Sequence, residues 1–467
     1  MSRRDWLLGA GAVLAAGRRG WGTTASAGTD LPHKRPPAGE RHFTSAAVEA
    51  AIQRVRAGIA DPGLAVLFEN CLPNTLDTTV WPGRFEGKPD TYVVTGDIDA
   101  MWLRDSTAQV WPYLASVRDE AGLDRLIRGV IHRQSDQILL DPYANAFLSD
   151  ERPSEWAGDA TEMRPGVHER KWEPDSLSAF CRLSAGYWHA SRSLRPFDPA
   201  WRAALGAVLR TLRTEQRLDG AGPYRFHRPD GDPTDVVPNN GLGAPTRPNG
   251  MVHGAFRPSD DASDLPLNVP INLALAAALD GVAPVAAAVD QPALATEARA
   301  LASEIRGGVA RDGLVREGPV AVWAYEVDGL GGQVRMDDAN APSLLSLPYF
   351  GACEPADPVY LDSRRWVLSP ADPWMFRGRI GDGVGSPHTG PGRIWPIAVA
   401  MRGLTTTSVE ERLAAIRLLG ASHAGTYLAH ESFDPDDPAH YTRPWFAWAN
   451  SLVGELLERA ALDGLLV

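Results

Sequence analysis

Lysine is scarce in this 467-residue chain, occurring only at Lys34, Lys88 and Lys171. The basic charge is therefore almost entirely arginine, and the formal net charge at pH 7 is -12. Nucleic-acid binding requires clustered Lys and Arg side chains that neutralise phosphates. Because the arginines are dispersed along an acidic chain, the composition argues against a nucleic-acid-binding protein.

Cysteine is also rare, and Cys71, Cys181 and Cys353 allow at most one disulfide. Cys181 lies on the apolar face of an expected helix, so we predict a buried thiol there. The chain has no Cys-x-x-Cys pair, and His430-Glu431 is followed by Ser-Phe-Asp rather than by the second histidine of a zinc-protease helix. The sequence therefore excludes a zinc-protease site.

No stretch after the N-terminus reaches the roughly 20 uncharged residues of a membrane span, so none is expected in the mature protein. The first residues resemble a twin-arginine export signal: Arg3-Arg4 precede the apolar run 7–17, and Ala25-Ser26-Ala27 is a small-x-small cleavage signature. An ordinary N-terminus with chance arginines is the alternative. We predict an export signal at 1–27, a linker at 28–40, one domain at 41–467, and a periplasmic or extracellular location.

Helical periodicity recurs along the chain. It predicts helices over Leu123–Ile138, Leu177–Trp188, Trp201–Leu212, Ala293–Val309, Val409–Leu419 and Phe446–Leu462. Ser408 and Glu411 have capping-box spacing before the fifth of these, and Gly420 is its expected end. Long Gly/Pro/Asp-rich connections (230–264 and 368–392) and a short strand-like run (320–327) lie between helices. The pattern favours one mainly α domain, a toroid of paired helices with its chemistry on long loops.

Several of these connections combine carboxylates with Arg, Asn or His and with aromatic rings, as in "TGDIDAMWLRDS" and "FRPSDDA". Carboxylates and amides bind hydroxyl pairs, and aromatic faces cover the C–H faces of a sugar. Each segment has a plainer interpretation: Asp105 could cap a helix, Trp102 could be core, and the Asp pairs 260/261 and 337/338 could be turn residues or calcium ligands. Recurrence in separate loops favours a site for a neutral polyhydroxylated ligand.

Asp175 presents a conflict, because it precedes an amphipathic helix predicted to begin at Ser176 and has the position of an N-cap. A helix N-terminus favours the ionised carboxylate. A glycosidase general acid must instead stay protonated near neutral pH. Burial against Trp172, or a second carboxylate nearby, would have to outweigh the helix dipole for Asp175 to serve as an acid.

The segments "TGDIDAMWLRDS", "FRPSDDA", "MDDANAPSLLSLPY", "GSPHTGPGRIWP" and "HESF" with "TRPWFAWANSL", from about Thr95 to Leu452, resemble glycoside hydrolase family 125 in content and order. The resemblance implies an (α/α)6 barrel and an exo-acting α-1,6-mannosidase that inverts configuration. It also implies no cofactor and no metal. The expected partner is an α-1,6-linked mannose-containing oligosaccharide or glycan.

Carried over by position, the family's general acid corresponds to Asp175 in "WEPDSL" and its general base to Glu431 in "HESF". The other matched positions are expected near the terminal mannose, either binding it or walling the site: Arg104, Asp105, Arg257, Asp260, Asp261, Asn340, His388, Trp102, Trp395 and Trp445.

Two alternatives remain at this level. Another exo-glycosidase on a helical toroid, such as an α-glucosidase or trehalase, would differ in how it reads the axial C2 hydroxyl of mannose. A sugar-binding protein without turnover would bind the ligand and release no product.

Overall fold

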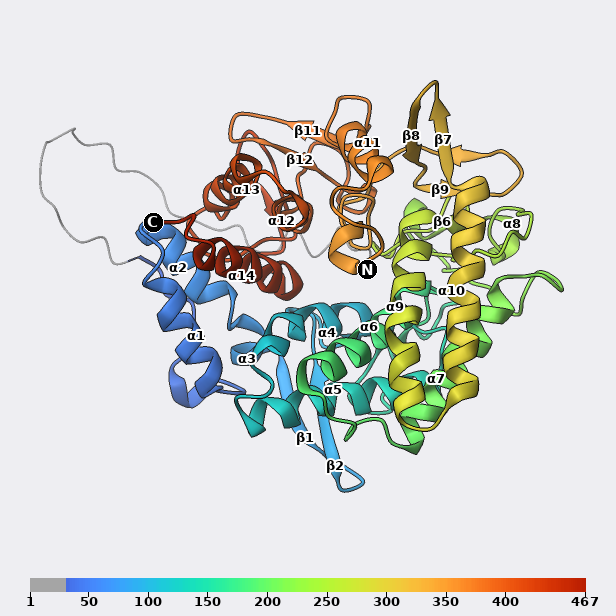
Figure 1. The fold of residues 1–467 in the computed structure, drawn as a ribbon, viewed down its shortest axis with the longest axis horizontal. Helices are drawn as coiled ribbons and strands as arrows, with labels where there is room; N and C mark the ends of the chain where they lie inside the picture. The colour runs from blue at the N-terminus through green and yellow to red at the C-terminus, as the bar shows by residue number, and fades with distance from the viewer. Residues whose placement is uncertain (1–30) are drawn as a thin grey trace, which may run out of the picture.

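A computed structural model describes residues 31–467, and its chain forms a closed ring of inner helices surrounded by outer ones (Figure 1). Each inner element contacts the next, and the last contacts the first. The inner elements are α4 (Leu103–Val110), α6 (Pro174–Ser191), α9 (Val269–Ala288), the 3-10 helix η5 (Leu347–Phe350), α12 (Pro396–Thr405) and α14 (Ala447–Leu462).

Outer helices alternate with these inner elements along the chain. They are α2 (Pro62–Cys71), α5 (Ala121–Leu140), α7 (Pro199–Glu215), α10 (Pro292–Asp312), α11 (Pro358–Val367) and α13 (Val409–Ser422). The alternation confirms the predicted (α/α)6 barrel. The fifth inner position of the barrel holds only the short η5. Its outer partner α11 is held to the preceding segment by the Tyr360 hydroxyl, which donates to the Leu345 carbonyl at 2.9 Å.

Short helices and strands fill the connections. The remaining helices are α1 (Ala46–Arg56), α3 (Asn74–Thr78) and α8 (Pro238–Gly241). The longer hairpins pair β1 (Val80–Phe85) with β2 (Lys88–Val93) and β7 (Leu314–Glu317) with β8 (Val320–Trp323). The short strands are β3 (Met101–Trp102), β4 (Ala146–Phe147), β5 (Val167–Glu169), β6 (Leu267–Asn268), β9 (Glu326–Val327), β10 (Gln333–Val334), β11 (Met375–Arg377), β12 (Asp382–Val384), β13 (Ser432–Phe433) and β14 (Tyr441–Thr442).

Several inner helices begin immediately after a strand or a turn that carries a predicted site residue. β3 leads directly into α4, Pro174 opens α6, and Trp395 is the N-cap of α12. Proline suits a first helical turn because its missing N–H has no partner there in any case. This arrangement collects the loops, and with them the predicted site, at the N-terminal ends of the inner helices.

All six predicted helices are confirmed, with differences at their ends. Ser408 caps α13 by accepting the Glu411 N–H at 3.2 Å, but α13 continues through Gly420 to Ser422. The predicted helix end at Gly420 was wrong. This glycine lets α13 pack closely against Leu64 of α2, because a Cβ there would lie 2.9 Å from a Leu64 side-chain carbon. The predicted strand 320–327 divides between β8 and β9, which belong to different sheets.

Helix α9 escaped prediction because it is apolar all round and shows no helical periodicity. Among residues 31–467 it is the single helix with the length and composition of a membrane span, and 67% of its apolar window is buried in the barrel. It packs between α6 and α10 as an inner helix.

The chain before α1 is described only from residue 31. The predicted export signal at 1–27 therefore lies outside the described residues. The described part of the predicted linker contacts the barrel, where the Arg35 Nε lies 2.7 Å from Asp77 Oδ2. All three cysteines are free, and Cys181 is buried as predicted.

Candidate active site

Arg104, in the first turn of α4, is at ion-pair distance from four carboxylates. Its guanidinium nitrogens lie 2.6 Å from Glu173, 3.0 Å from Asp175, 3.0 Å from Asp260 and 3.5 Å from Asp105. The Arg104 side chain is 7% exposed and the Asp175 side chain 2%. Taking one carboxylate out of water costs several kcal/mol, so a single guanidinium cannot keep all four in the ionised form. The cluster must hold protons.

The position of Asp175 on α6 differs from the predicted N-cap. The N-cap is Glu173, Pro174 is the first helical residue, and Asp175 lies in the first turn. The prediction was wrong because it began the helix at Ser176 and did not use the preference of proline for the first helical position. Asp175 consequently points from inside the first turn toward Arg104, while Glu173 reaches the same guanidinium from outside the helix.

Burial decides the conflict over the protonation of Asp175. It raises the pKa of the Asp175 carboxyl above its usual value, although Arg104 acts in the opposite direction. Burial likewise raises the pKa of Asp105 to about 6. No described group donates a hydrogen bond to Asp175 Oδ1. Asp175 therefore has the environment of a proton donor despite its position at a helix N-terminus.

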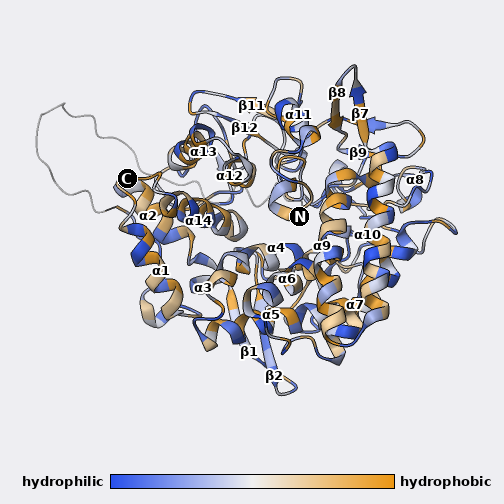
Figure 2. Cartoon of the chain, viewed as in Figure 1, coloured by the Kyte–Doolittle hydropathy of each residue, from blue (hydrophilic) through white to orange (hydrophobic). Residues whose placement is uncertain are grey.

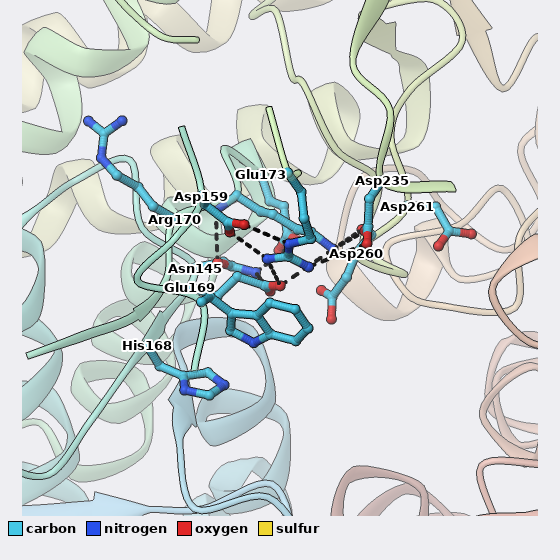
Figure 3. A network of polar contacts seen from close by, with 12 residues as sticks. Asn145, Asp159, His168, Glu169, Arg170, Glu173, Asp235, Asp260 and Asp261 are labelled. Carbon is cyan, nitrogen blue, oxygen red and sulfur yellow. Dashed lines mark hydrogen bonds and ion pairs between the residues drawn. The ribbon is translucent and has the colours of Figure 1, made fainter. Parts of the chain in front are cut away.

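A second layer of charged and amide side chains supports this cluster (Figure 3). The Asn145 side-chain amide donates to both Glu169 and Glu173 at 3.1 Å. Arg228 binds Glu169 at 2.9 Å and Asp159 at 2.6 Å. These contacts hold the segment that precedes α6, and with it Glu173, in place beneath Arg104.

Lys171 joins this layer to the loop that carries Asp260. This fully buried ammonium donates at 2.7 Å to Asp235 and at 2.7 Å to the Asp260 carbonyl. Asp260 has a positive φ of 69°, a backbone conformation that Asp adopts more readily than most residues. The Lys171 contact helps to position the Asp260 carboxylate beside Arg104.

The next residue, Asp261, connects two loops that are distant in sequence. Its Oδ1 lies 2.9 Å from His388 Nδ1, and the other carboxylate oxygen, Oδ2, has no hydrogen-bond partner in residues 31–467. His388 also lies edge-on to Trp395, at 6.2 Å between ring centroids. The structure thus brings together three predicted site residues.

Two other predicted residues are occupied by protein partners. Arg257 makes a two-point ion pair with Glu326, at 2.6 and 3.0 Å. Asn340 donates from its backbone and side chain to Asp338, at 3.0 and 3.3 Å. Both side chains are buried and braced, and their direct contact with a ligand stays a prediction.

Glu431 lies on a separate element, β13–β14 and the residues beside it. Its Oε1 is 3.4 Å from the Arg443 guanidinium, which also binds Asp97. The Glu431 side chain is 10% exposed. Trp445 follows on the same segment, and its ring covers Gly96, where a Cβ would lie 3.4 Å from the indole.

The predicted aromatic residues occupy distinct positions. Trp102, on β3, is 5% exposed, and its indole N–H has no acceptor among residues 31–467. Trp395 donates its indole N–H to the Thr389 hydroxyl at 2.8 Å. Trp448, which was not predicted, lies below the Arg104 guanidinium at 5.8 Å from its ring centroid.

Sequence reasoning missed Glu173, Lys171 and Asp97 as site residues. Glu173 stands two residues before Asp175 in "WEPDSL", so the pair of carboxylates was visible in the sequence. Lys171 could have been found by its rarity, because a lone lysine between two glutamates suggests a buried charge partner. Asp97 lies in the first quoted segment, but nothing in the sequence links it to Arg443.

One family model matches most of this chain. The model of the family described as metal-independent alpha-mannosidase (GH125) matches residues 61–458. The meiotically up-regulated gene 157 protein of Schizosaccharomyces pombe is 37% identical over 447 residues, covering 91% of this chain and 88% of that protein.

Solved structures extend the comparison. A metal-independent α-mannosidase of Streptococcus pneumoniae, in a non-productive complex with α-1,6-mannobiose, is 37% identical, with a TM-score of 0.86 over 91% of this chain and 99% of that one. A bacterial glucoamylase bound to acarbose, at 12% identity and a TM-score of 0.55 over 88% of this chain and 58% of that one, shares the fold.

Proposed function

The chain belongs to the metal-independent α-mannosidases of glycoside hydrolase family 125, and on that premise we propose that it releases a non-reducing terminal α-1,6-linked mannose with inversion of configuration. The observation that carries the proposal is the Arg104 cluster, which places Asp175 where burial favours its protonated form. The similar Streptococcus pneumoniae structure, whose ligand is α-1,6-mannobiose, supports the linkage.

In the proposed reaction the Asp175 carboxyl donates its proton to the glycosidic oxygen as the C1–O bond breaks. Glu431 accepts a proton from a water molecule, and the water oxygen bonds to C1 from the opposite face of the ring. After one turnover Asp175 is ionised and Glu431 protonated, so one proton must return from Glu431 to Asp175 through solvent. Arg104 stabilises the Asp175 carboxylate that forms, and Arg443 lies beside Glu431 before it accepts the proton.

The remaining residues are proposed to bind the terminal sugar. Asp105, Asp260 and Asp261 supply carboxylate oxygens for hydroxyl groups, and the Asp261–His388 contact fixes the direction of one of them. Trp102, Trp395 and Trp445 provide apolar walls. The pair Arg257–Glu326 acts by bracing the loop that bears Asp260 and Asp261.

A panel of mannobioses tests the linkage, and a longer substrate tests the mode of attack. We expect hydrolysis of α-1,6-mannobiose. Hydrolysis of the α-1,2 and α-1,3 isomers and of α-1,6-linked glucobiose should be at least tenfold slower. From α-1,6-mannotetraose, mannose and mannotriose should be the first products. Equal rates across the panel would overturn the linkage, and mannobiose as the first product would overturn exo attack. Binding without product from any substrate would favour the sugar-binding alternative.

We further propose that residues 1–27 direct export. Cell fractionation of full-length protein and of an Arg3→Lys/Arg4→Lys variant tests this, since the paired arginines are the feature that carries the proposal. Retention of the variant in the cytoplasm is expected. Equal export of both proteins would contradict a twin-arginine signal.

A further inference from the structure

The β1–β2 hairpin extends from the outer wall of the barrel with two aromatic side chains exposed. It projects at the lower edge of the ring, with hydrophilic residues toward its turn (Figure 2). Trp81 is 55% exposed and Phe85 57%, whereas large aromatic residues in this chain are mostly buried. In a strand, residues two and four positions apart face the same side, so Trp81, Gly83 and Phe85 form one row.

Gly83 keeps this row open between the rings. A Cβ at this position would meet nothing closer than the Asp90 carbonyl at 3.9 Å. Trp81 is steadied from one side by His42, with ring centroids 4.0 Å apart. The hairpin therefore presents two planar apolar surfaces that are separated by a glycine and held by local contacts.

A surface hollow adjoins Phe85, between the hairpin, α5 and the start of α7. It is lined by Phe85, Lys88, Asp90, His132 and Asp136 of the hairpin and α5, and by Asp198 near α7. Lys88 is paired with Asp198 at 2.5 Å, and Asp90 with Arg133 at 2.7 Å. These ion pairs shape the hollow and leave their cations satisfied.

Of the titratable groups that line the hollow, His132 is enclosed by protein and Asp136 is open to a ligand. His132 is 9% exposed; its Nδ1 donates to the Pro89 carbonyl at 2.8 Å, while its Nε2 has no partner in the described part of the chain. Asp136, one helical turn further along α5, makes no ion pair with any residue of 31–467 at contact distance. A ligand hydroxyl could donate to the exposed Asp136 carboxylate, whose oxygens only accept, whereas the His132 Nε2 atom is itself enclosed by protein.

The chemistry of the hollow selects against other ligand classes. Both nearby cations are paired and the carboxylates are in excess, so an anionic ligand is disfavoured. In residues 31–467 no three carboxylate, imidazole or thiol groups are arranged to share a metal ion. Charged Lys88 and Asp90, the cross-strand partners of Phe85 and Gly83, flank the aromatic row, which is unlike the continuous apolar core of a dimer interface.

We propose that Trp81, Phe85 and the hollow beside them form a second, non-catalytic binding site for a neutral oligosaccharide. The rings stack on sugar C–H faces, and the Asp136 carboxylate accepts hydrogen bonds from hydroxyl groups. The identification of the sugar as an α-linked mannose rests on the proposed function. The site would hold another part of the same glycan, or a neighbouring chain, near the barrel.

Affinity electrophoresis in gels containing soluble α-1,6-linked mannan tests the site in full-length protein that carries Glu431→Gln to prevent turnover. Trp81→Ala/Phe85→Ala is expected to weaken the mannan-dependent retardation at least threefold, and Asp136→Asn, which removes no ion pair, at least twofold. The matched control Leu330→Ala removes a side chain that is 59% exposed on a different loop and should leave retardation unchanged.

When Glu431 is intact, the Trp81→Ala/Phe85→Ala variant should have the same kcat/KM as the unaltered protein on α-1,6-mannobiose. Its kcat/KM on the polymer should be lower than that of the unaltered protein. Retardation equal to the control in both the Trp81→Ala/Phe85→Ala variant and the Asp136→Asn variant would overturn the second site. A dimer that dissociates in the double variant, measured by light scattering, would assign the rings to self-association and also overturn it. Failure to hydrolyse mannobiose, with hairpin-dependent retardation intact, would sink the proposed function and leave the second site standing.

Discussion

Asp175 and Glu431 lie in two regions that differ in the number of carboxylates sharing one guanidinium. Around Asp175, one guanidinium is shared by four carboxylates, and the Asp175 side chain is 2% exposed. Around Glu431, one guanidinium is shared by two carboxylates, Glu431 and Asp97, and the Glu431 side chain is 10% exposed. Asp175 thus shares its guanidinium with three other carboxylates, whereas Glu431 shares its guanidinium with one.

The proposed acid and the proposed base therefore differ in their surroundings more than in their side chains. Burial raises the pKa of Asp175, Glu173 and Asp105, and Arg104 limits that rise without cancelling it. Asp260 differs, because Arg104 and Lys171 outweigh its burial and lower its pKa. A general acid needs a raised pKa, and the surroundings of Asp175 supply one. The predictions below test whether this contrast governs activity.

The largest effect is expected from removing either carboxylate. Asp175→Asn and Glu431→Gln should each lower kcat on α-1,6-mannobiose by about 10²- to 10⁴-fold, the range for loss of general acid or base catalysis. Circular dichroism spectra should match the unaltered protein. Near-normal turnover in either variant would remove that residue from its proposed role.

An aryl α-mannoside with a good leaving group separates the two roles. Its leaving group departs without protonation, so Asp175→Asn should recover most activity on this substrate. Glu431→Gln should stay inactive, because water must still be activated. The reverse pattern would exchange the two assignments.

Loss of Arg104 should damage stability as well as catalysis. Arg104→Gln leaves buried carboxylates without their cation, and breaking buried charge pairs costs roughly 3–5 kcal/mol. The pKa values of those carboxyl groups rise above their unfolded values, so the folded variant binds more protons than its unfolded chain. Its stability should therefore increase as pH falls, and urea unfolding should show a larger deficit at pH 8 than at pH 5.

Arg152→Gln provides the matched control. Arg152 pairs with Asp99 on the surface, with side chains 42% and 66% exposed. Such pairs contribute at most about 1 kcal/mol. If Arg104→Gln lowers the free energy of unfolding by no more than Arg152→Gln does, the buried cluster does not depend on its guanidinium.

Glu173→Gln should have a small effect. Burial, together with the nearby Asp260 and Asp175 carboxylates, holds the pKa of Glu173 well above its usual range, so the amide preserves the charge of the protonated acid. We expect kcat/KM to fall by less than about fivefold, the equivalent of one hydrogen bond. In a plot of kcat/KM against pH, the fall in activity on the alkaline side should occur at the same pH as in the unaltered protein. A shift of this limb to lower pH by more than about one unit would show that Glu173 is ionised and raises the pKa of Asp175.

Chelation should have the smallest effect. Incubation with EDTA followed by gel filtration is expected to leave kcat unchanged, in keeping with the family's description. Activity that is lost and then restored by Ca²⁺ would make the Asp pairs at 260/261 and 337/338 candidate ligands.

The ring of helices was predictable where helices are amphipathic, as α5, α7 and α10 show. It was not predictable at α9, whose apolar surface gives no period, or at η5, where one short turn replaces an inner helix. Ring closure depends on contacts between α14 and α4, more than 300 residues apart in sequence. Local patterns carry no information about such a pairing.

Within the site, residue types were predictable and partnerships were not. The sequence singled out Arg104, Asp175 and Asp260, which do converge. It also singled out Arg257, whose partner Glu326 lies on the short strand β9 and is invisible to motif reasoning. The protonation of Asp175 depends on its burial and on the number of carboxylates around Arg104, and both follow from tertiary structure alone.

The most direct test follows the anomeric proton of the mannose released from α-1,6-mannobiose by NMR during the first turnovers. The assignment of Asp175 as acid and Glu431 as base for an attacking water predicts β-mannose first, with α-mannose appearing later by mutarotation. α-Mannose as the first product would contradict it, because retention requires a covalent or otherwise double displacement at C1.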